Sequence, residues 1–225
     1  NILQKYPFVD YIIRREGEVT FLELIQTCMK KPNCDFSSIK GLTYREGEEI
    51  ISNEDRPLIK DINILPMVDR ELIDMDFYKE FNYKTLPIVR ETPVSIMFTS
   101  RGCPFKCVFC SSKFMWEREF RSFTPERVLA EIKNLYHTYG IKEIAFCDDQ
   151  FFVDKKRAET ILDDIIDLNL GISFSVPSGT SSWILDENLL RKMKKAGFYR
   201  LCFPIESGNK NTVNFIKKPI NLKKV

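Results

Sequence analysis

The sequence predicts an α/β fold in which a parallel sheet carries its helices on the outside. Four short apolar segments are each followed by a segment with the periodicity and the capping residues of a helix. The apolar segments contain few polar residues, as expected for strands that are buried on both faces. Repeated β-then-α units of this kind form parallel sheets. We therefore predict four such units in the second part of the chain.

The first 93 residues are predicted to be organised differently. Residues 1–37 have the pattern of a strand and a helix, and residues 38–93 that of a hairpin followed by a proline-punctuated linker. The expected elements are a strand at Val9–Arg14, a helix at Phe21–Lys31 capped by Thr20, hairpin strands at Gly41–Arg45 and Glu49–Ser52 around a Glu46-Gly47 turn, and a short helix near Arg70–Phe81.

Residues 94–225 are predicted to hold the four repeats. Capping residues define where the helices begin, and glycines define two of their ends. The expected strands are Val94–Thr99, Ile144–Cys147, Ile172–Val176 and Arg200–Ile205, and the expected helices run from Thr124 to Gly140, Asp154 to Leu168, Asp186 to Gly197 and Asn209 to Lys217.

Polar clusters directly follow three of these strands. They are the cysteine loop after Val94–Thr99, the pair Asp148-Asp149, and Glu206-Ser207-Gly208. The carboxyl ends of parallel strands meet at one rim of the sheet, which is where such folds place their chemistry. We therefore expect the three clusters to meet there.

The cysteine loop is the strongest chemical signal. Cys103, Cys107 and Cys110 follow a C-x3-C-x2-C spacing, and thiolates this close together can hold an iron–sulfur cluster. A cubane has four irons, so three thiolates leave one iron open to a small molecule. Structural zinc usually needs four ligands, and neither Cys147 in a strand nor His137 on a helix is a convincing fourth. Three unrelated buried thiols remain the other alternative.

Composition excludes several classes of protein. The net charge is +2, which gives no electrostatic case for nucleic acid, and no apolar run is long enough to span a membrane. Seven cysteines without an export signal favour a reducing compartment, the cytoplasm. No functional role is predicted for several other residues. We expect buried small side chains at Cys28, Cys34, Cys147 and Cys202, a structural residue at His137, and a solvated face at Lys217, Lys218, Lys223 and Lys224.

The segment Ser100–Cys110 resembles the cluster-binding motif of the radical S-adenosylmethionine (radical SAM) enzymes. The resemblance continues at Phe123–Val128, Ile144–Phe151 and Leu201–Gly208. It implies a partial (βα) barrel in which Cys103, Cys107 and Cys110 hold a [4Fe–4S] cluster. In that family the open iron binds S-adenosylmethionine, and the reduced cluster cleaves it to a 5′-deoxyadenosyl radical.

The same resemblance implies contacts with S-adenosylmethionine. Phe109 matches the aromatic residue near the adenine, and Asp148 or Asp149 would lie near the amino group, where an acid complements an ammonium. A helix-capping or solvent-exposed acidic pair is the alternative for the two aspartates. Glu206, followed by Ser207, would contact the ribose or the amino acid portion, although Pro204 stands where the family usually has glycine.

The segment Val9–Leu24 resembles the last strand and helix of a cobalamin (B12)-binding domain. The subgroup in which such a domain precedes the radical barrel is therefore implied, with the chain as a piece truncated after about four βα units. The expected domains are a cobalamin-domain tail at 1–37, a hairpin and linker at 38–93, and the first part of the barrel at 94–225. The cobalamin-ligand motif Asp-x-His-x-x-Gly is absent, so we expect cobalamin only in a longer parent protein.

The resemblance predicts a metal-binding enzyme that starts radical chemistry, of the methyltransferase or the oxidative cyclase type. It implies a small-molecule substrate and an electron donor such as flavodoxin or ferredoxin. A different hypothesis is an iron–sulfur electron-transfer or sensing module without catalysis, which requires Cys147 as a fourth ligand.

Overall fold

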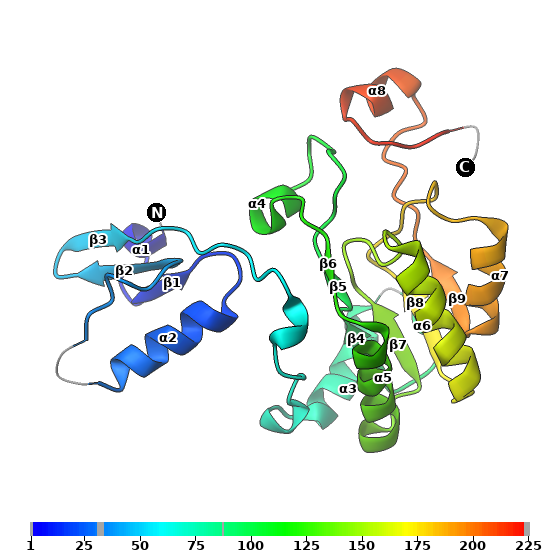
Figure 1. Cartoon of the computed structure of the whole chain (residues 1–225), viewed down its shortest axis with the longest axis horizontal. Helices are drawn as coiled ribbons and strands as arrows, with labels where there is room; N and C mark the ends of the chain where they lie inside the picture. Colours follow the sequence, from blue (N-terminus) through cyan, green and yellow to red (C-terminus); the bar gives the residue numbers. More distant parts are fainter. Residues whose placement is uncertain (1, 31–33, 87, 223–225) are drawn as a thin grey trace. The chain divides into compact units, whose positions relative to one another are not determined.

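The computed structural model describes residues 2–30, 34–86 and 88–222, which form two compact units. The first unit ends at Lys60 and the second begins at Asp61 (Figure 1). No helix in the described part of the chain is both long enough and apolar enough to cross a membrane.

The first unit is a three-stranded antiparallel sheet with a helix. Strand β1 pairs with β2 and β2 with β3, so the expected hairpin joins the preceding strand in one sheet. The boundary expected after residue 37 therefore falls inside this unit. Its elements are α1 (Ile2–Lys5), β1 (Tyr11–Ile13), α2 (Glu18–Cys28), β2 (Leu42–Glu46) and β3 (Glu49–Ser52).

The helix start predicted in this unit is wrong. Helix α2 begins at Glu18, and Gly17 rather than Thr20 occupies its N-cap. Thr20 lies fully buried within the helix, where its hydroxyl donates to the Lys40 carbonyl at 2.9 Å and accepts from Arg56 at 2.8 Å. The hydroxyl thus makes a tertiary contact, which local capping rules do not anticipate.

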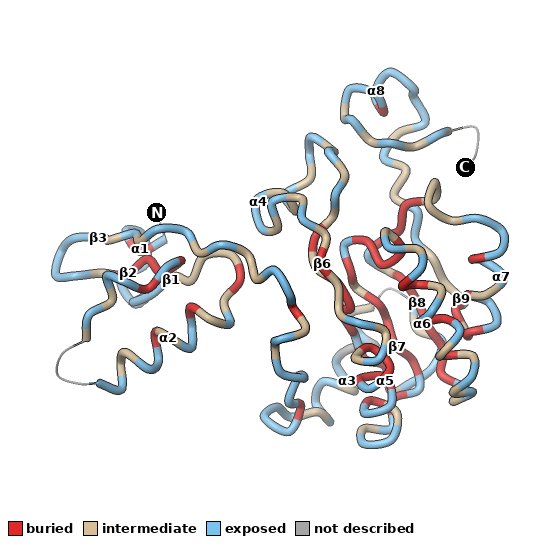
Figure 2. The backbone as a smooth tube through the Cα atoms, viewed as in Figure 1, coloured by how far each residue is buried: buried red, intermediate tan, exposed pale blue. Residues whose placement is uncertain are grey.

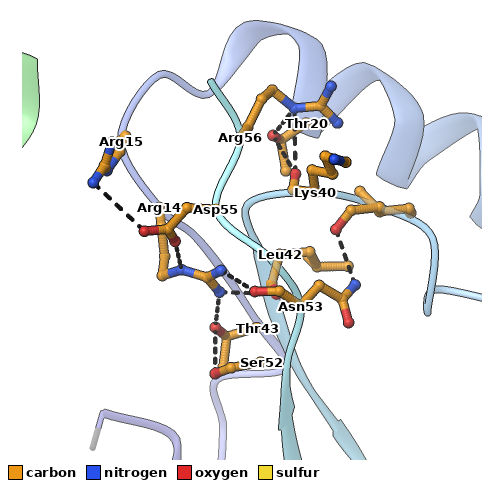
Figure 3. A network of polar contacts seen from close by, with 11 residues as sticks. Arg14, Arg15, Thr20, Lys40, Leu42, Thr43, Ser52, Asn53, Asp55 and Arg56 are labelled. Atoms are coloured by element: carbon orange, nitrogen blue, oxygen red, sulfur yellow. Dashed lines mark hydrogen bonds and ion pairs between the residues drawn. The ribbon is translucent and has the colours of Figure 1, made fainter. Parts of the chain in front are cut away.

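Polar contacts centred on Arg14 connect β1 to the segment that leaves β3 (Figure 3). The guanidinium donates to the Asp55 carboxylate at 2.9 Å, to the Leu42 carbonyl at 2.9 Å, and to Thr43 and the Asn53 carbonyl. One planar group with several fixed donors therefore orders two segments about 40 residues apart in sequence. The apolar side of the unit packs Leu24, Ile39, Leu42 and Tyr44 together.

The second unit contains the predicted parallel sheet. Its strands are adjacent in the order β4-β7-β8-β9, and each neighbouring pair is parallel. A separate antiparallel pair, β5-β6, extends from the end of β4. The elements are η1 (Ile62–Ile64), η2 (Arg70–Leu72), α3 (Met75–Thr85), β4 (Val94–Met97), β5 (Ser100–Arg101), α4 (Ser112–Trp116), β6 (Arg121–Ser122), α5 (Pro125–Tyr139), β7 (Glu143–Phe146), α6 (Lys155–Leu168), β8 (Ser173–Val176), α7 (Glu187–Lys195), β9 (Phe198–Leu201) and α8 (Lys210–Phe215).

One hydrophobic core joins the sheet to α5, α6 and α7 (Figures 1 and 2). Phe146, Phe174 and Phe198 stack across three neighbouring strands, with ring centroids 5.2–5.8 Å apart. Leu135 and Ile161 are fully buried on the helices that cover this face. The aromatic stack thus fixes the sheet against its helical layer.

The helix starts predicted for the four repeats are confirmed, whereas the short helix expected near Arg70–Phe81 begins later, at Met75. The side chains of Thr124, Asp154, Asp186 and Asn209 each accept a backbone N–H in the first turn of α5, α6, α7 and α8. The last strand was placed too late, because β9 covers Phe198–Leu201 and leaves Pro204 and Glu206 in the loop beyond it. Pairing with β8 determines the position of β9, and the local apolar pattern alone does not predict it.

Gly197, which connects α7 to β9, provides a test of this packing. It has φ of +95°, and an added Cβ would lie 2.6 Å from the Ile172 carbonyl oxygen. Gly197→Ala should therefore suffer both the left-handed strain of about 1–2 kcal/mol and an overpacking cost of about 1–3 kcal/mol. Gly171→Ala is the matched control, since Gly171 has φ of +69° with open space around it. Thermal unfolding midpoints that fall equally for the two variants would contradict this packing.

Candidate active site

A pocket of about 240 Å³ lies at the carboxyl ends of the parallel strands. Four segments meet in it: the cysteine loop after β4, the residues after β7, the loop after β8, and the chain beyond β9. The polar clusters expected at one rim therefore do converge. The lining residues used below are Cys103, Phe105, Cys107, Phe109, Cys110, Ser112, Asp149, Gln150, Ser178, Trp183, Glu206 and Lys218.

Gly102 determines how the cysteine loop leaves the sheet. Its φ is +84°, and a Cβ here would lie only 2.0 Å from the Glu119 carbonyl oxygen. The backbone of the returning β6 segment thus packs directly on the glycine, which only a residue without a side chain permits. Further along, Cys110 N–H donates to the Cys107 carbonyl at 3.3 Å, which closes a turn that carries two of the three thiols.

Burial changes the pKa of two of the three thiols. Burial is the main reason that the pKa of Cys103 is raised to about 11; a backbone hydrogen bond at Phe105 opposes the rise, and the charges of Asp149 and the other two thiols add to it. Burial also raises the pKa of Cys107, while the cation of Lys218 opposes this rise. Thiols held protonated by burial ionise when a metal replaces the proton, and that makes the set suited to soft metal ions.

The thiols are not arranged around a single ion. Among the described residues no group of three His, Cys, Asp or Glu side chains is placed to hold one metal. A multinuclear cluster makes a different demand, since each thiolate binds its own iron. Three free cysteines lining one pocket with apolar neighbours fit that demand. Phe105 supplies part of the apolar wall and packs edge-on against Trp183, with centroids 5.2 Å apart.

The two neighbouring aspartates have separate environments. Asp148 is fully buried, and its Oδ1 accepts hydrogen bonds from Thr99 N–H at 2.9 Å, Thr99 Oγ1 at 2.9 Å and Ser100 Oγ at 2.5 Å. Burial raises the pKa of this carboxyl, and the bonds from Ser100 and Thr99 oppose the rise. Asp149 is exposed, lines the pocket and accepts from Ser112 Oγ at 2.9 Å. Asp148 thus secures the end of β4, and Asp149 faces the pocket.

The chain beyond β9 contributes Glu206. This residue has φ of +68°, unusual for a side chain other than glycine, asparagine or aspartate, and its carboxylate pairs with Lys218 Nζ at 2.9 Å. Ser207 does not line the pocket; its Oγ accepts from Asn209 N–H at 3.1 Å and so supports the start of α8. Phe109 does line the pocket, with its ring 5.9 Å from Lys218 Nζ.

Sequence reasoning missed several pocket residues. Lys218 was expected on a solvated face, yet its side chain is only 7% exposed and lies in the pocket. Gln150 and Trp183 were not singled out, and both line the pocket. The place of Gln150 in the sequence, directly after the Asp148-Asp149 pair, was a signal that it could line the pocket. Nothing local marks Lys218, because the fold of the distant C-terminal segment places it there.

Other expectations for polar residues have mixed outcomes. His137 lies exposed on α5, and it does not line the pocket. Cys147 is partly buried, bonds with Ser178 and does not line the pocket either. Cys202 is exposed, not buried, because β9 ends at Leu201 and leaves the next residue uncovered. Lys223 and Lys224 lie outside the described residues.

A partial parallel barrel with three thiols and two carboxylates at its carboxyl rim defines a class: barrel enzymes that hold an iron–sulfur cofactor. The family model of the radical SAM superfamily matches residues 97–225. The chain belongs to this superfamily, whose domain uses a [4Fe–4S] cluster and S-adenosylmethionine.

Curated relatives cover both units of the chain. An uncharacterized methyltransferase of Pyrococcus horikoshii is 36% identical over 97% of this chain and 45% of its own length. An anaerobic magnesium-protoporphyrin IX monomethyl ester cyclase of Synechocystis is 28% identical over 97% of this chain and 41% of its own. The chain therefore spans less than half the length of these relatives.

Solved structures show the same fold. The radical S-adenosylmethionine methyltransferase TsrM from Kitasatospora setae, with tryptophan and a SAM analogue bound, superposes with a TM-score of 0.73 at 14% identity, covering 94% of this chain and 40% of TsrM. The cobalamin-dependent S-adenosylmethionine radical enzyme OxsB gives 0.70 at 20% identity, covering 99% of this chain and 31% of OxsB. The predicted partial barrel is thereby confirmed.

Substituting the two aspartates should give different effects on stability. Asp148→Ala leaves the Thr99 N–H and two hydroxyls buried without their acceptor, which should lower the free energy of unfolding by on the order of 3 kcal/mol. Asp149→Ala removes an exposed side chain and should change it by less than about 0.5 kcal/mol. Urea unfolding of both variants measures this difference, and equal losses would show that Asp148 does not secure the end of β4.

The raised pKa of Asp148 also predicts a pH dependence. The folded chain holds this proton more tightly than the unfolded chain, whose carboxyl has the ordinary value of 3.8. Stability relative to Asp148→Asn, which cannot ionise, should therefore fall as the pH rises from 3.8 through the raised pKa, and then level off. Unfolding free energies of the two proteins across this range measure the effect. A relative stability that increases with pH would contradict it.

Proposed function

We propose that this chain is the part of a cobalamin-associated radical SAM enzyme that binds the cluster and S-adenosylmethionine. The single observation that carries the proposal is the pocket, in which three thiols and two carboxylates from distant segments converge. Cys103, Cys107 and Cys110 would hold a [4Fe–4S] cluster through three of its irons. When bound, the cluster supplies the electron for reductive cleavage of S-adenosylmethionine.

The side chains around the thiols would bind and orient S-adenosylmethionine. Asp149 offers an exposed carboxylate that complements the amino group, and Glu206 would contact the ribose or the amino acid portion. Phe109 offers an aromatic face for the adenine. Asp148 and Ser207 would act indirectly, since each uses its oxygen to hold the backbone that carries the contacting residues.

Phe105 and Trp183 would exclude water from one side of the pocket through their edge-on packing. Water exclusion strengthens the pairing of charges inside a site, because the local dielectric is lower than in bulk water. The Asp149 carboxylate is held by Ser112, so it is oriented before any ligand arrives. Orientation before binding lowers the entropic cost of binding the ligand.

The reaction is proposed to be methyl transfer or oxidative cyclisation on a small-molecule substrate. Relatives named as methyltransferases and as a cyclase support these two classes. Cobalamin would bind in a longer protein that includes this chain, with residues 1–37 as the tail of its cobalamin-binding domain; OxsB, which has the same fold, is described with aqua-cobalamin bound. The proposal includes a flavodoxin- or ferredoxin-type electron donor and a cytoplasmic location.

The electron-transfer or sensing alternative is not favoured. It needs a fourth thiolate from Cys147, whose side chain bonds with Ser178 and does not line the pocket. The relatives at this level of similarity are enzymes.

Anaerobic reconstitution tests the proposal directly. The chain is loaded with iron and sulfide, reduced, and given S-adenosylmethionine, while EPR spectra are recorded before and after the addition. A cluster signal that shifts on addition is expected, because the open iron takes the cofactor. 5′-Deoxyadenosine formation would then report the radical chemistry. An unchanged signal from a loaded cluster, in this chain and in a longer protein containing it, would overturn the proposal.

Cysteine variants identify the ligands. Cys103→Ala, Cys107→Ala and Cys110→Ala should each lose most of the bound iron and sulfide, because each removes one of three ligands. Cys147→Ala is the matched control, a partly buried cysteine near the same rim, and it should retain the cluster. Iron and sulfide content measures the outcome. Loss of the cluster in Cys147→Ala would instead support a closed site with four thiolates.

A further inference from the structure

Lys218 is a charged side chain in the pocket that holds the thiols, and no local sequence pattern predicts this position. Its side chain is 7% exposed, although it follows an exposed lysine, Lys217, at the end of α8. Its Nζ lies 2.9 Å from the Glu206 carboxylate and 5.9 Å from the centre of the Phe109 ring. Lys218 lines the same pocket as all three cysteines of the loop.

The backbone holds Lys218 in this position. Its N–H donates to the Val213 carbonyl at 3.2 Å, and its carbonyl accepts from Ile220 N–H at 2.9 Å. The preceding turn is joined to the cysteine loop, since Val108 N–H donates to the Ile216 carbonyl at 3.0 Å. Backbone hydrogen bonds therefore hold the segment that carries Lys218 against the cysteine loop, so the position of the ammonium does not depend on the flexible side chain alone.

Burying an ammonium is costly unless nearby negative charge compensates for it. Glu206 supplies one carboxylate, but that side chain is 37% exposed and so remains largely stabilised by water. The stronger demand for a cation arises when the thiols ionise and carry a cluster. Reduction of such a cluster adds one further negative charge in a pocket of low dielectric. A fixed cation there stabilises the reduced form more than the oxidised form.

We propose that Lys218 is a positioning residue that raises the reduction potential of the cluster and holds the Glu206 carboxylate at the pocket. This inference rests on the proposed function, because it requires a cluster on Cys103, Cys107 and Cys110. It assigns the C-terminal segment a specific electrostatic role in making the cluster easier to reduce. Lys218 itself does not ligate iron.

The test uses the 225-residue chain, reconstituted with iron and sulfide and free of S-adenosylmethionine. Its readout is the midpoint potential of the cluster, from a redox titration followed by EPR, together with iron and sulfide content. Lys218→Met removes the charge and the donor, Lys218→Gln removes the charge but keeps a donor for Glu206, and Lys218→Arg keeps both. Lys217→Met is the matched control, an exposed neighbour with the same charge.

Both neutral variants are expected to shift the midpoint potential to more negative values. Lys218→Arg should stay close to the unsubstituted chain, and Lys217→Met should leave the potential unchanged. A purely structural ion pair with Glu206 would instead be rescued by Lys218→Gln. Loaded Lys218→Met and Lys218→Gln with the original potential would therefore overturn the inference.

The failure modes are distinguishable. If neither the unsubstituted chain nor a longer protein containing it takes up iron and sulfide, the proposed function itself fails. The neutral variants could fail to take up iron and sulfide although the unsubstituted chain does. In that case Glu206→Gln is the deciding variant. Removing the opposing carboxylate should leave the Lys218 cation less compensated and move the midpoint potential to more positive values. An unchanged potential in loaded Glu206→Gln would then overturn the inference.

Discussion

The buried carboxylate of Asp148 fixes the point at which the sheet passes into the site. It lies at the end of β7 and accepts three hydrogen bonds from Thr99 and Ser100 at the end of β4. From the other side, Arg157 on α6 donates to the Thr99 carbonyl at 2.8 Å and to the Phe123 carbonyl at 2.7 Å. Two strands, a helix and the β6 connection are thereby joined at one place. The cysteine loop begins at Gly102, two residues after Ser100, so the direction in which it leaves the sheet depends on these contacts.

The C-terminal segment of the second unit completes the pocket. The chain beyond β9 carries Glu206 in a left-handed conformation and then returns through α8 to the cysteine loop. Strained backbone of this kind persists only where surrounding contacts hold it, and such positions cluster at functional sites. The ion pair between Glu206 and Lys218 is one of those contacts. The result is a pocket lined by three thiols, two carboxylates and one largely buried cation.

The chemistry of the site follows from this arrangement of charge. Under the proposed function, iron would displace the protons of the thiols, among which burial raises the pKa of Cys103 and Cys107, and the nearby Lys218 cation would compensate for the negative charge. An exposed carboxylate at Asp149 remains available to a cationic ligand, whereas its neighbour Asp148 is already committed to the backbone. Adjacent residues of one type thus differ in role because the sheet turns one inward and the other outward.

Much of the fold and the cluster motif was predictable from the sequence alone. Caps such as Thr124 and Asp154 act within one turn of a helix, and the spacing of Cys103, Cys107 and Cys110 lies within one loop, so local sequence determines both. Thr20, the position of β9 and the burial of Lys218 were decided otherwise. Each depends on a partner distant in sequence: Lys40 and Arg56 for Thr20, β8 for β9, and the cysteine loop for Lys218. Only the tertiary structure brings such partners together, because strand register and the return path of the chain are set by packing over the whole sheet.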